Sequence, residues 1–199
     1  MIFLGSVDLV LLFGSHLTLA LHQQMSRKAY LLAALVAIVA IFVAIDINRE
    51  RFYVFDPEVL HKVASEVGTM NISTKAKIDR VVSELAKIYP KYIDTHEEWI
   101  FNVAAGAMGH MTLLHCSITE YIMIFGSAIG TEGYSGRYMS DDYFSIIEGE
   151  QHSYFVGELE PRIYRPGSEV NLMPRGVATG YKMPHKTYAL GTFLFDAFV

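Results

Sequence analysis

The sequence predicts an α+β fold, in which an N-terminal transmembrane helix and short helices precede an antiparallel β-sandwich or barrel. Three observations support this fold: a uniformly apolar run near the N-terminus, helical spacing of apolar residues from 56 to 88, and short apolar runs between turn residues after Gly130. With 199 residues, the chain fits one ordinary domain plus an anchor. We expect a membrane anchor region over residues 1–50 and one folded domain over residues 51–199.

The transmembrane prediction rests on Tyr30–Ile45, which contains no charge and no proline. As a helix this run would rise about 24 Å, slightly less than the roughly 30 Å hydrocarbon core of a bilayer. A buried core helix is the alternative for the same pattern. Positive residues lie on both sides of the run, so the sequence does not set the membrane orientation. Residues 2–21 are also apolar, and a weak first span, an interfacial segment and a wrongly chosen start codon stay open as explanations.

Apolar residues at helical spacing between Asp56 and Ile88 predict two amphipathic helices. Pro57 suits a first helical turn, residues 71–74 look like a break with capping residues, and Pro90 ends the second helix. The apolar block from 99 to 130 contains small and polar residues, which favours the interior of the domain over a second span.

The composition of the chain argues for some classes of protein and against others. Hydrophobic residues make up 52%, charged residues 19%, and the mean hydropathy is +0.28, which indicates a membrane-associated protein. The net charge of −5 and the lack of a basic run argue against nucleic acid as a partner. Cys116 is the only cysteine, so an internal disulfide and a cysteine metal cluster are excluded. His110 and His115 do not share a helix face with Glu120, so we expect core histidines and no metal.

The most informative side chains are carboxylates set among apolar runs: Glu120, Asp141, Asp142 and Glu148. A buried carboxyl that holds its proton has a raised pKa and is a candidate proton donor. Asp141 and Asp142 would face opposite sides of a strand, so at most one points into a barrel. The alternative is an acid pair at a turn, with one member paired to Arg137, and a surface position for Glu148.

The chain also contains 12 Tyr and 12 Phe, many of them in its second half. Aromatic side chains of this kind line pockets for flat hydrophobic ligands and stabilise cations. An ordinary aromatic core explains the same composition.

Several long motifs occur in a characteristic order: FNVAAGAMGHMTLLHCSITEYIMIFGSAIGTEGYSGRY, then DDYFSIIEGEQ, then IYRPGSEVNLMPRGVATGYKMP. Between about Phe52 and Leu190 the chain resembles the family of fungal C-8 sterol isomerases and the animal sigma non-opioid intracellular receptor. The resemblance implies an endoplasmic reticulum membrane protein with a cupin-like β-barrel, a sterol substrate, contact with membrane lipid, homo-oligomers and no metal or organic cofactor.

The resemblance further implies a reaction that moves the sterol double bond from delta-8 to delta-7, as from fecosterol to episterol in ergosterol biosynthesis. The catalytic candidates are Asp141, Asp142 and Glu120. The candidates for substrate binding are Tyr121, Phe125, Tyr138, Phe144 and Tyr188. In the receptor branch an acid falls where this chain has Phe144. A ligand-binding regulator or chaperone like the receptor is the alternative function, and a structural membrane protein with solvated acids is a third.

One departure from the family pattern concerns the end of the chain. Members of the family continue after TYAL with a Glu and later with apolar helices, whereas this chain reads Gly191 and Thr192 and ends at Val199. The resemblance therefore implies a barrel truncated at its C-terminal end, without the second expected acid. Such a barrel would keep an open edge and an exposed apolar interior.

Overall fold

The computed structural model describes residues 27–104 and 107–195, and the chain divides into two units, residues 1–47 and 48–199. In the first unit, helix α2 (Arg27–Ile47) contains the predicted span Tyr30–Ile45. Its 21 residues rise about 32 Å, enough to cross the hydrocarbon core of a bilayer. Within the described residues it is the one helix that is long and apolar enough to do so. The expectations for residues 2–21 fall outside the described part of the chain.

The second unit begins with the short 3-10 helix η1 (Arg49–Phe52) and two α-helices, α3 (Pro57–Gly68) and α4 (Thr74–Ile88), as the apolar spacing predicts. The Asp56 carboxylate caps α3 by accepting a hydrogen bond from the Glu58 backbone N–H. The Ser73 hydroxyl caps α4 in the same way through the Ala76 N–H. Each helix buries one apolar stripe.

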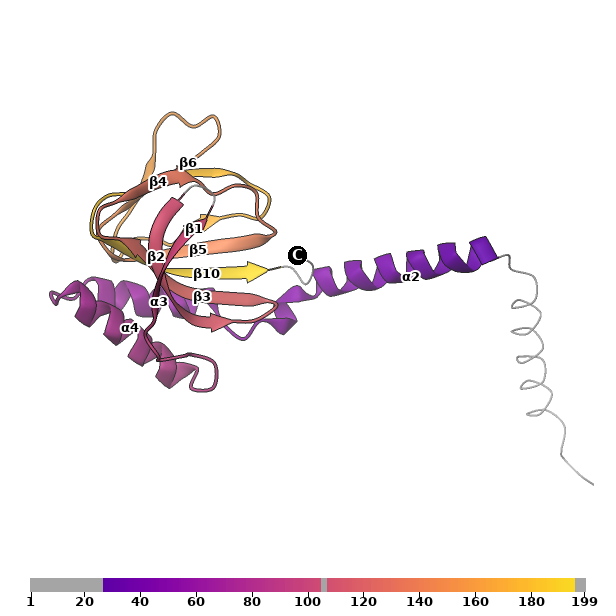
Figure 1. The fold of residues 1–199 in the computed structure, drawn as a ribbon, viewed down its shortest axis with the longest axis horizontal. Coiled ribbons are helices and arrows are strands. Elements are labelled where there is room, and N and C mark those ends of the chain that lie inside the picture. The colour runs from indigo at the N-terminus through magenta and orange to yellow at the C-terminus, as the bar shows by residue number, and fades with distance from the viewer. Residues whose placement is uncertain (1–26, 105–106, 196–199) are drawn as a thin grey trace, which may run out of the picture. The chain divides into compact units, whose positions relative to one another are not determined.

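Antiparallel strands follow and form two sheets. The larger sheet has the order β1-β2-β3-β10-β5-β8, with bounds Trp99–Ala104, Ala107–Cys116, Glu120–Ser127, Thr187–Phe195, Ser140–Glu148 and Asn171–Met173. The smaller sheet has the order β4-β9-β6-β7, with bounds Thr131–Tyr134, Thr179–Met183, Gln151–Phe155 and Arg162–Tyr164. Figure 1 shows the resulting layers: α3 and α4 lie along one face of the larger sheet, and the smaller sheet covers the other face.

The α+β class and the antiparallel strands agree with the prediction, but the sheets do not close into a barrel. Among the described strands, none pairs with a strand of the other sheet. The sheets approach each other at β2 and β4, where the Met108 N–H donates to the Thr131 hydroxyl at 3.1 Å. A cavity between two facing sheets therefore takes the place of a closed barrel.

Three central strands, β3, β5 and β10, divide the core into two compartments. Ile122, Ile147 and Leu190 point toward the helices and pack with the buried stripes of α3 and α4. Met123, Phe144 and Ala189 belong to the opposite cluster between the sheets. Because successive side chains of a strand point to opposite faces, a single strand serves both compartments.

Polar contacts fix the helices to the larger sheet. The Lys77 ammonium forms an ion pair with Glu148 of β5 at 2.8 Å and donates to the Gly68 carbonyl at 2.8 Å. The His61 ring contacts the buried Ser145 hydroxyl at 2.9 Å. Glu148, one of the four carboxylates singled out in the sequence, is therefore half-buried in a structural ion pair.

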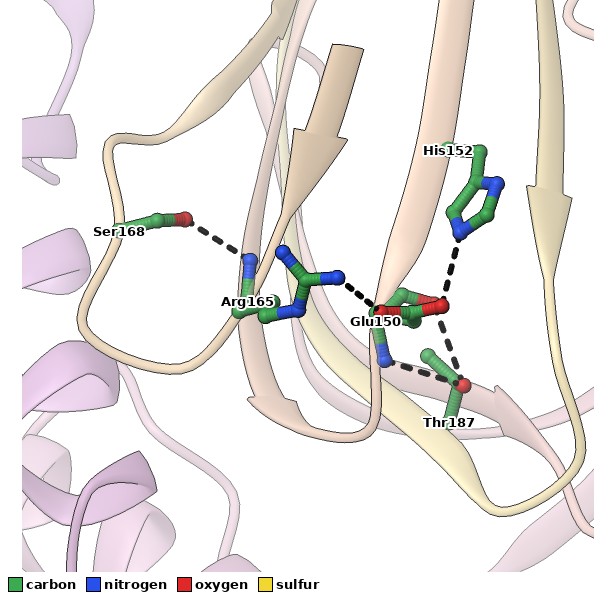
Figure 2. Close-up of polar contacts among 5 residues, drawn as sticks. All are labelled: Glu150, His152, Arg165, Ser168 and Thr187. Carbon is green, nitrogen blue, oxygen red and sulfur yellow. Dashed lines mark hydrogen bonds and ion pairs between the residues drawn. The ribbon is translucent and has the colours of Figure 1, made fainter. Parts of the chain in front are cut away.

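A second network holds the turn between β5 and β6 (Figure 2). The Glu150 carboxylate contacts His152 at 2.8 Å and Arg165 at 2.7 Å, and its backbone N–H donates to the Thr187 hydroxyl. Ser168 completes the network by accepting from the Arg165 N–H. These contacts join the turn to the segment after β7 and to the start of β10.

Replacing the α4 cap tests how far the helical layer depends on it. Ser73→Ala removes the acceptor for the Ala76 N–H and should lower the free energy of unfolding by about 1 kcal/mol. Ser83→Ala, on the exposed side of the same helix, is the matched control and should be neutral or slightly stabilising, because alanine favours helix. Thermal unfolding of the full chain in detergent measures both. Equal destabilisation by the two substitutions would contradict the capping role.

Candidate active site

A cavity of about 240 Å³ lies between the two sheets of the second unit. Side chains from both sheets line it, and most of them are apolar or aromatic. The lining residues are Asn102, Tyr121, Met123, Phe125, Ser135, Tyr138, Ser140, Asp142, Phe144, Gln151, Met173, Tyr181, Met183, Phe193 and Phe195. A concave, mostly apolar space with a few polar groups is the usual form of a small-molecule site.

Asp142 is the carboxylic acid among these lining residues. Its side chain lies on β5 and is only 2% exposed, and the Ser140 hydroxyl, two residues earlier on the same face, donates to its Oδ1 at 2.5 Å. Burial raises the pKa of Asp142 to about 7, the Ser140 hydrogen bond opposes that rise, and the charge of Asp141 adds to it. Near neutral pH this carboxyl therefore exists in both protonation states, as a proton donor requires.

Asp141 points to the other side of β5, as alternation along a strand predicts for adjacent acids. Its Oδ1 accepts a hydrogen bond from the Arg175 backbone N–H at 2.9 Å, and the residue does not line the cavity. Of the two neighbouring acids, only Asp142 reaches the space where a ligand would lie.

Glu120 is buried, with 1% of its surface exposed, but on the helix-facing side of β3. Its carboxylate accepts hydrogen bonds from the Val54 N–H at 2.9 Å and from the Phe55 N–H at 2.8 Å. Glu120 thus ties the segment before α3 to the larger sheet, a structural role. Its neighbour Tyr121 has the opposite orientation and lines the cavity.

Four of the five predicted substrate-binding residues line the cavity: Tyr121, Phe125, Tyr138 and Phe144. Burial and the nearby Asp142 carboxylate raise the pKa of Tyr138. Tyr188 lies elsewhere, because it shares the helix-facing orientation of Leu190 on β10. Its hydroxyl contacts the His110 ring at 3.1 Å.

His115 contacts the Tyr92 carbonyl at 2.9 Å, and neither it nor His110 lines the cavity. Both histidines therefore have protein partners outside the cavity.

Several of the lining residues were not predicted from the sequence. Ser140 and Asp142 form an i, i+2 pair that alternation alone would place on one face, so that signal was present. Gln151, Met173 and Tyr181 come from other strands, and only their pairing brings them to the cavity.

Gly191 lies in the wall of the cavity, between Met123 of β3 and Phe144 of β5. A Cβ atom at this position would meet Met123 Cε, Phe144 Cε1 and Phe193 Cε2, each at 3.3 Å. A side chain here would therefore point into the cavity, at the position where the family resemblance places a Glu.

Comparisons with known proteins agree on one family. A family model described as "ERG2 and Sigma1 receptor like protein" matches residues 31–192. The C-8 sterol isomerase erg2 of Aspergillus fumigatus is 45% identical over 82% of this chain and 70% of its own length. The C-8 sterol isomerase of Pyricularia oryzae is 46% identical over 79% of this chain and 73% of its own length. The Sigma non-opioid intracellular receptor 1 of Xenopus tropicalis is 32% identical over 70% of this chain and 65% of its own length.

Among solved structures, an RmlC-like cupin from Shewanella frigidimarina overlaps 52% of this chain and 89% of its own, with 18% identity and a TM-score of 0.43.

Titration of Asp142 tests the electrostatics of the cavity. The folded pKa near 7 exceeds the usual 3.8, so the folded state binds more protons between these values and its stability falls as pH rises from about 4 to 7. Carbon-13 NMR of labelled aspartates should show one carboxyl with a midpoint near 7, absent in Asp142→Asn and shifted downward in Asp141→Asn. A midpoint near 4 for Asp142 would contradict the buried environment.

The structural role of Glu120 predicts a loss of stability on truncation. Glu120→Ala leaves two buried or partly buried N–H groups without their acceptor, at a cost of about 1–3 kcal/mol for each unsatisfied group. Glu120→Gln keeps one acceptor oxygen and should lose less. Chemical denaturation of the full chain measures the free energy of unfolding of both variants. If Glu120→Ala is as stable as the wild type, these hydrogen bonds do not stabilise the fold.

Proposed function

The chain belongs to the family of ERG2 and Sigma1 receptor like proteins, and we propose that it is a C-8 sterol isomerase. The proposed reaction moves the ring double bond of a sterol from delta-8 to delta-7, as from fecosterol to episterol in ergosterol biosynthesis. Several fungal relatives that are about 45% identical are named C-8 sterol isomerases. The observation that carries the proposal is Asp142, a buried carboxyl with a pKa of about 7 in an apolar cavity.

The proposed chemistry needs only proton transfer. The Asp142 proton adds to C9, and the π electrons of the C8–C9 double bond form the new C9–H bond, which leaves a cation at C8. A proton then leaves C7, and the two electrons of the broken C7–H bond form the C7–C8 double bond and neutralise the cation at C8. The double bond has moved by one position, with no net change in atoms or electrons.

The cavity favours this path electrostatically. The Asp142 carboxylate formed in the first step lies in a low-dielectric setting, where its attraction for the cation at C8 is strong. Faces of Tyr121, Phe144 and Phe193 stabilise the same charge. Among the described lining residues Asp142 is the one Asp or Glu, so its own conjugate base accepts the C7 proton on the proposed path.

We propose that the protein works in the endoplasmic reticulum membrane, where α2 anchors the second unit next to its lipid-borne substrate. The length and composition of α2 support a membrane anchor. Homo-oligomers and contact with membrane lipid, which the family resemblance implies, stay predictions.

Ligand binding without turnover is a second candidate function, since one relative is a sigma receptor. A carboxylate beside aromatic rings also binds an amine cation, so the same cavity suits a cationic amphiphile. Turnover of delta-8 sterol separates the two functions.

Expression of the full chain in cells that lack their own isomerase tests the proposal, with delta-8 and delta-7 sterols as the readout. Asp142→Asn removes the proton donor and should lower conversion by at least about 100-fold. Asp141→Asn, outside the cavity, should lose less than about tenfold. In membranes, wild-type conversion should fall as pH rises above about 7, because the donor loses its proton.

Conversion by Asp142→Asn at the wild-type rate would overturn the assignment of the donor. Wild-type chain that binds amines but leaves delta-8 sterol unchanged would favour the receptor-like function.

A further inference from the structure

A pair of buried amides crosses between the two sheets at the cavity. Gln151 begins β6 of the smaller sheet and is 1% exposed, and Asn171 begins β8 of the larger sheet and is 2% exposed. The Asn171 Nδ2 donates to the Gln151 Oε1 at 3.2 Å. Amides are costly to bury in an apolar setting without hydrogen-bond partners, so their position in this cavity calls for polar contacts.

The Gln151 amide has further hydrogen-bonding capacity on the cavity side. A glutamine side chain offers two acceptor positions and two donors, and the bond from Asn171 uses one acceptor position. Gln151 lines the cavity, whereas Asn171 is not among the lining residues and contacts Gln151. Asn171 therefore orients Gln151, and Gln151 faces a ligand.

Strand register places this pair relative to Asp142. On β5, Asp142 pairs with Met173 and Phe144 pairs with Asn171. Two residues of strand span about 7 Å, so the amide pair begins about 7 Å along the cavity wall from the level of Asp142. Phe144, which is level with Asn171, adds an apolar surface to the cavity wall at the amide end.

The turn directly before Gln151 is held by several polar contacts. Glu150, the preceding residue, contacts His152, Arg165 and Thr187 in the network of Figure 2. A polar group that follows a turn fixed in this way is preorganised, so little entropy is lost when a ligand binds to it.

We propose that Gln151, positioned by Asn171, binds the 3-hydroxyl group of the sterol and thereby sets the C8–C9 bond at Asp142. This inference rests on the proposed function. In a sterol the 3-hydroxyl and the C8–C9 bond lie at opposite ends of the fused A and B rings, a separation comparable to that between the amide pair and the acid. The flat ring face then lies against the aromatic wall to which Phe144 belongs.

Competition binding on the purified full chain in lipid nanodiscs tests the proposal. The two ligands are a delta-8 sterol with the 3β-hydroxyl and its 3-deoxy counterpart with the same ring skeleton. Wild type should prefer the hydroxylated ligand by about tenfold, the effect of one buried hydrogen bond. Gln151→Met should bring the ratio close to one, and Asn171→Leu should reduce it partly.

Two control variants separate this inference from other effects. Met183→Leu changes another lining side chain without a polar group, so it should alter the affinity for both ligands alike and keep their ratio. Asp142→Asn should abolish conversion but also keep the ratio. The two proposals can fail separately. If Gln151→Met loses the preference for the hydroxylated ligand but the wild-type chain does not convert delta-8 sterol, the hydroxyl site is supported and the isomerase proposal fails.

A preserved hydroxyl preference in folded Gln151→Met would overturn the inference, even with normal turnover by wild type. If Gln151→Met does not fold, an NMR experiment on the wild-type chain tests the same contact. With nitrogen-15 labelled glutamine, the hydroxylated ligand should shift the side-chain amide signals of Gln151 more than the 3-deoxy ligand does. Equal shifts from the two ligands would also overturn it.

Discussion

The alternation of side chains along β3, β5 and β10 is the constraint on which the rest of the structure depends. Each of these strands presents one set of residues to the helices and the next set to the cavity, so one sheet supports two separate interiors. Because of this alternation, the Glu120 carboxylate accepts hydrogen bonds from the backbone of the segment before α3, whereas the Tyr121 side chain lines the cavity. The alternation likewise separates Asp141 from Asp142, and a shift of register by one residue would exchange all of these roles.

The chemistry of the cavity follows from its mostly apolar lining and from the lack of positively charged side chains among the described lining residues. No Lys, Arg or His occurs among the described lining residues, so the Asp142 carboxyl lacks a cation that would hold it ionised. The same apolar surroundings that make ionisation costly make the resulting carboxylate an effective partner for a transient cation. Burial therefore supports both halves of a proton shift, and the hydroxyl of Ser140 moderates the balance.

Sequence patterns predicted much of the fold and part of the site. Hydrophobic run length and helical spacing identified α2, α3 and α4, turn residues indicated the strands after Gly130, and long motifs identified the family. The three strands before Gly130 were predicted only as part of the domain interior. Apolar neighbours correctly indicated that Glu120 is buried, but its side of the sheet depends on strand pairing. Tyr188 illustrates the same limit: alternation along β10 places it on the same side as Leu190, and only the strand pairing shows that this side faces the helices. Gln151 and Asn171 are distant in sequence and meet only through tertiary pairing.

Among the described residues, no strand of one sheet pairs with a strand of the other. This has a consequence for how a rigid polycyclic ligand would enter the cavity between them. In a closed barrel, admitting such a molecule through the wall would break a ladder of backbone hydrogen bonds. Here the smaller sheet is held over the larger one chiefly by side-chain packing and scattered bonds such as that from Met108 to Thr131. Separation of the two sheets would break side-chain contacts and such single hydrogen bonds but neither backbone ladder, so entry of a ligand between them would cost less than entry through the wall of a closed barrel.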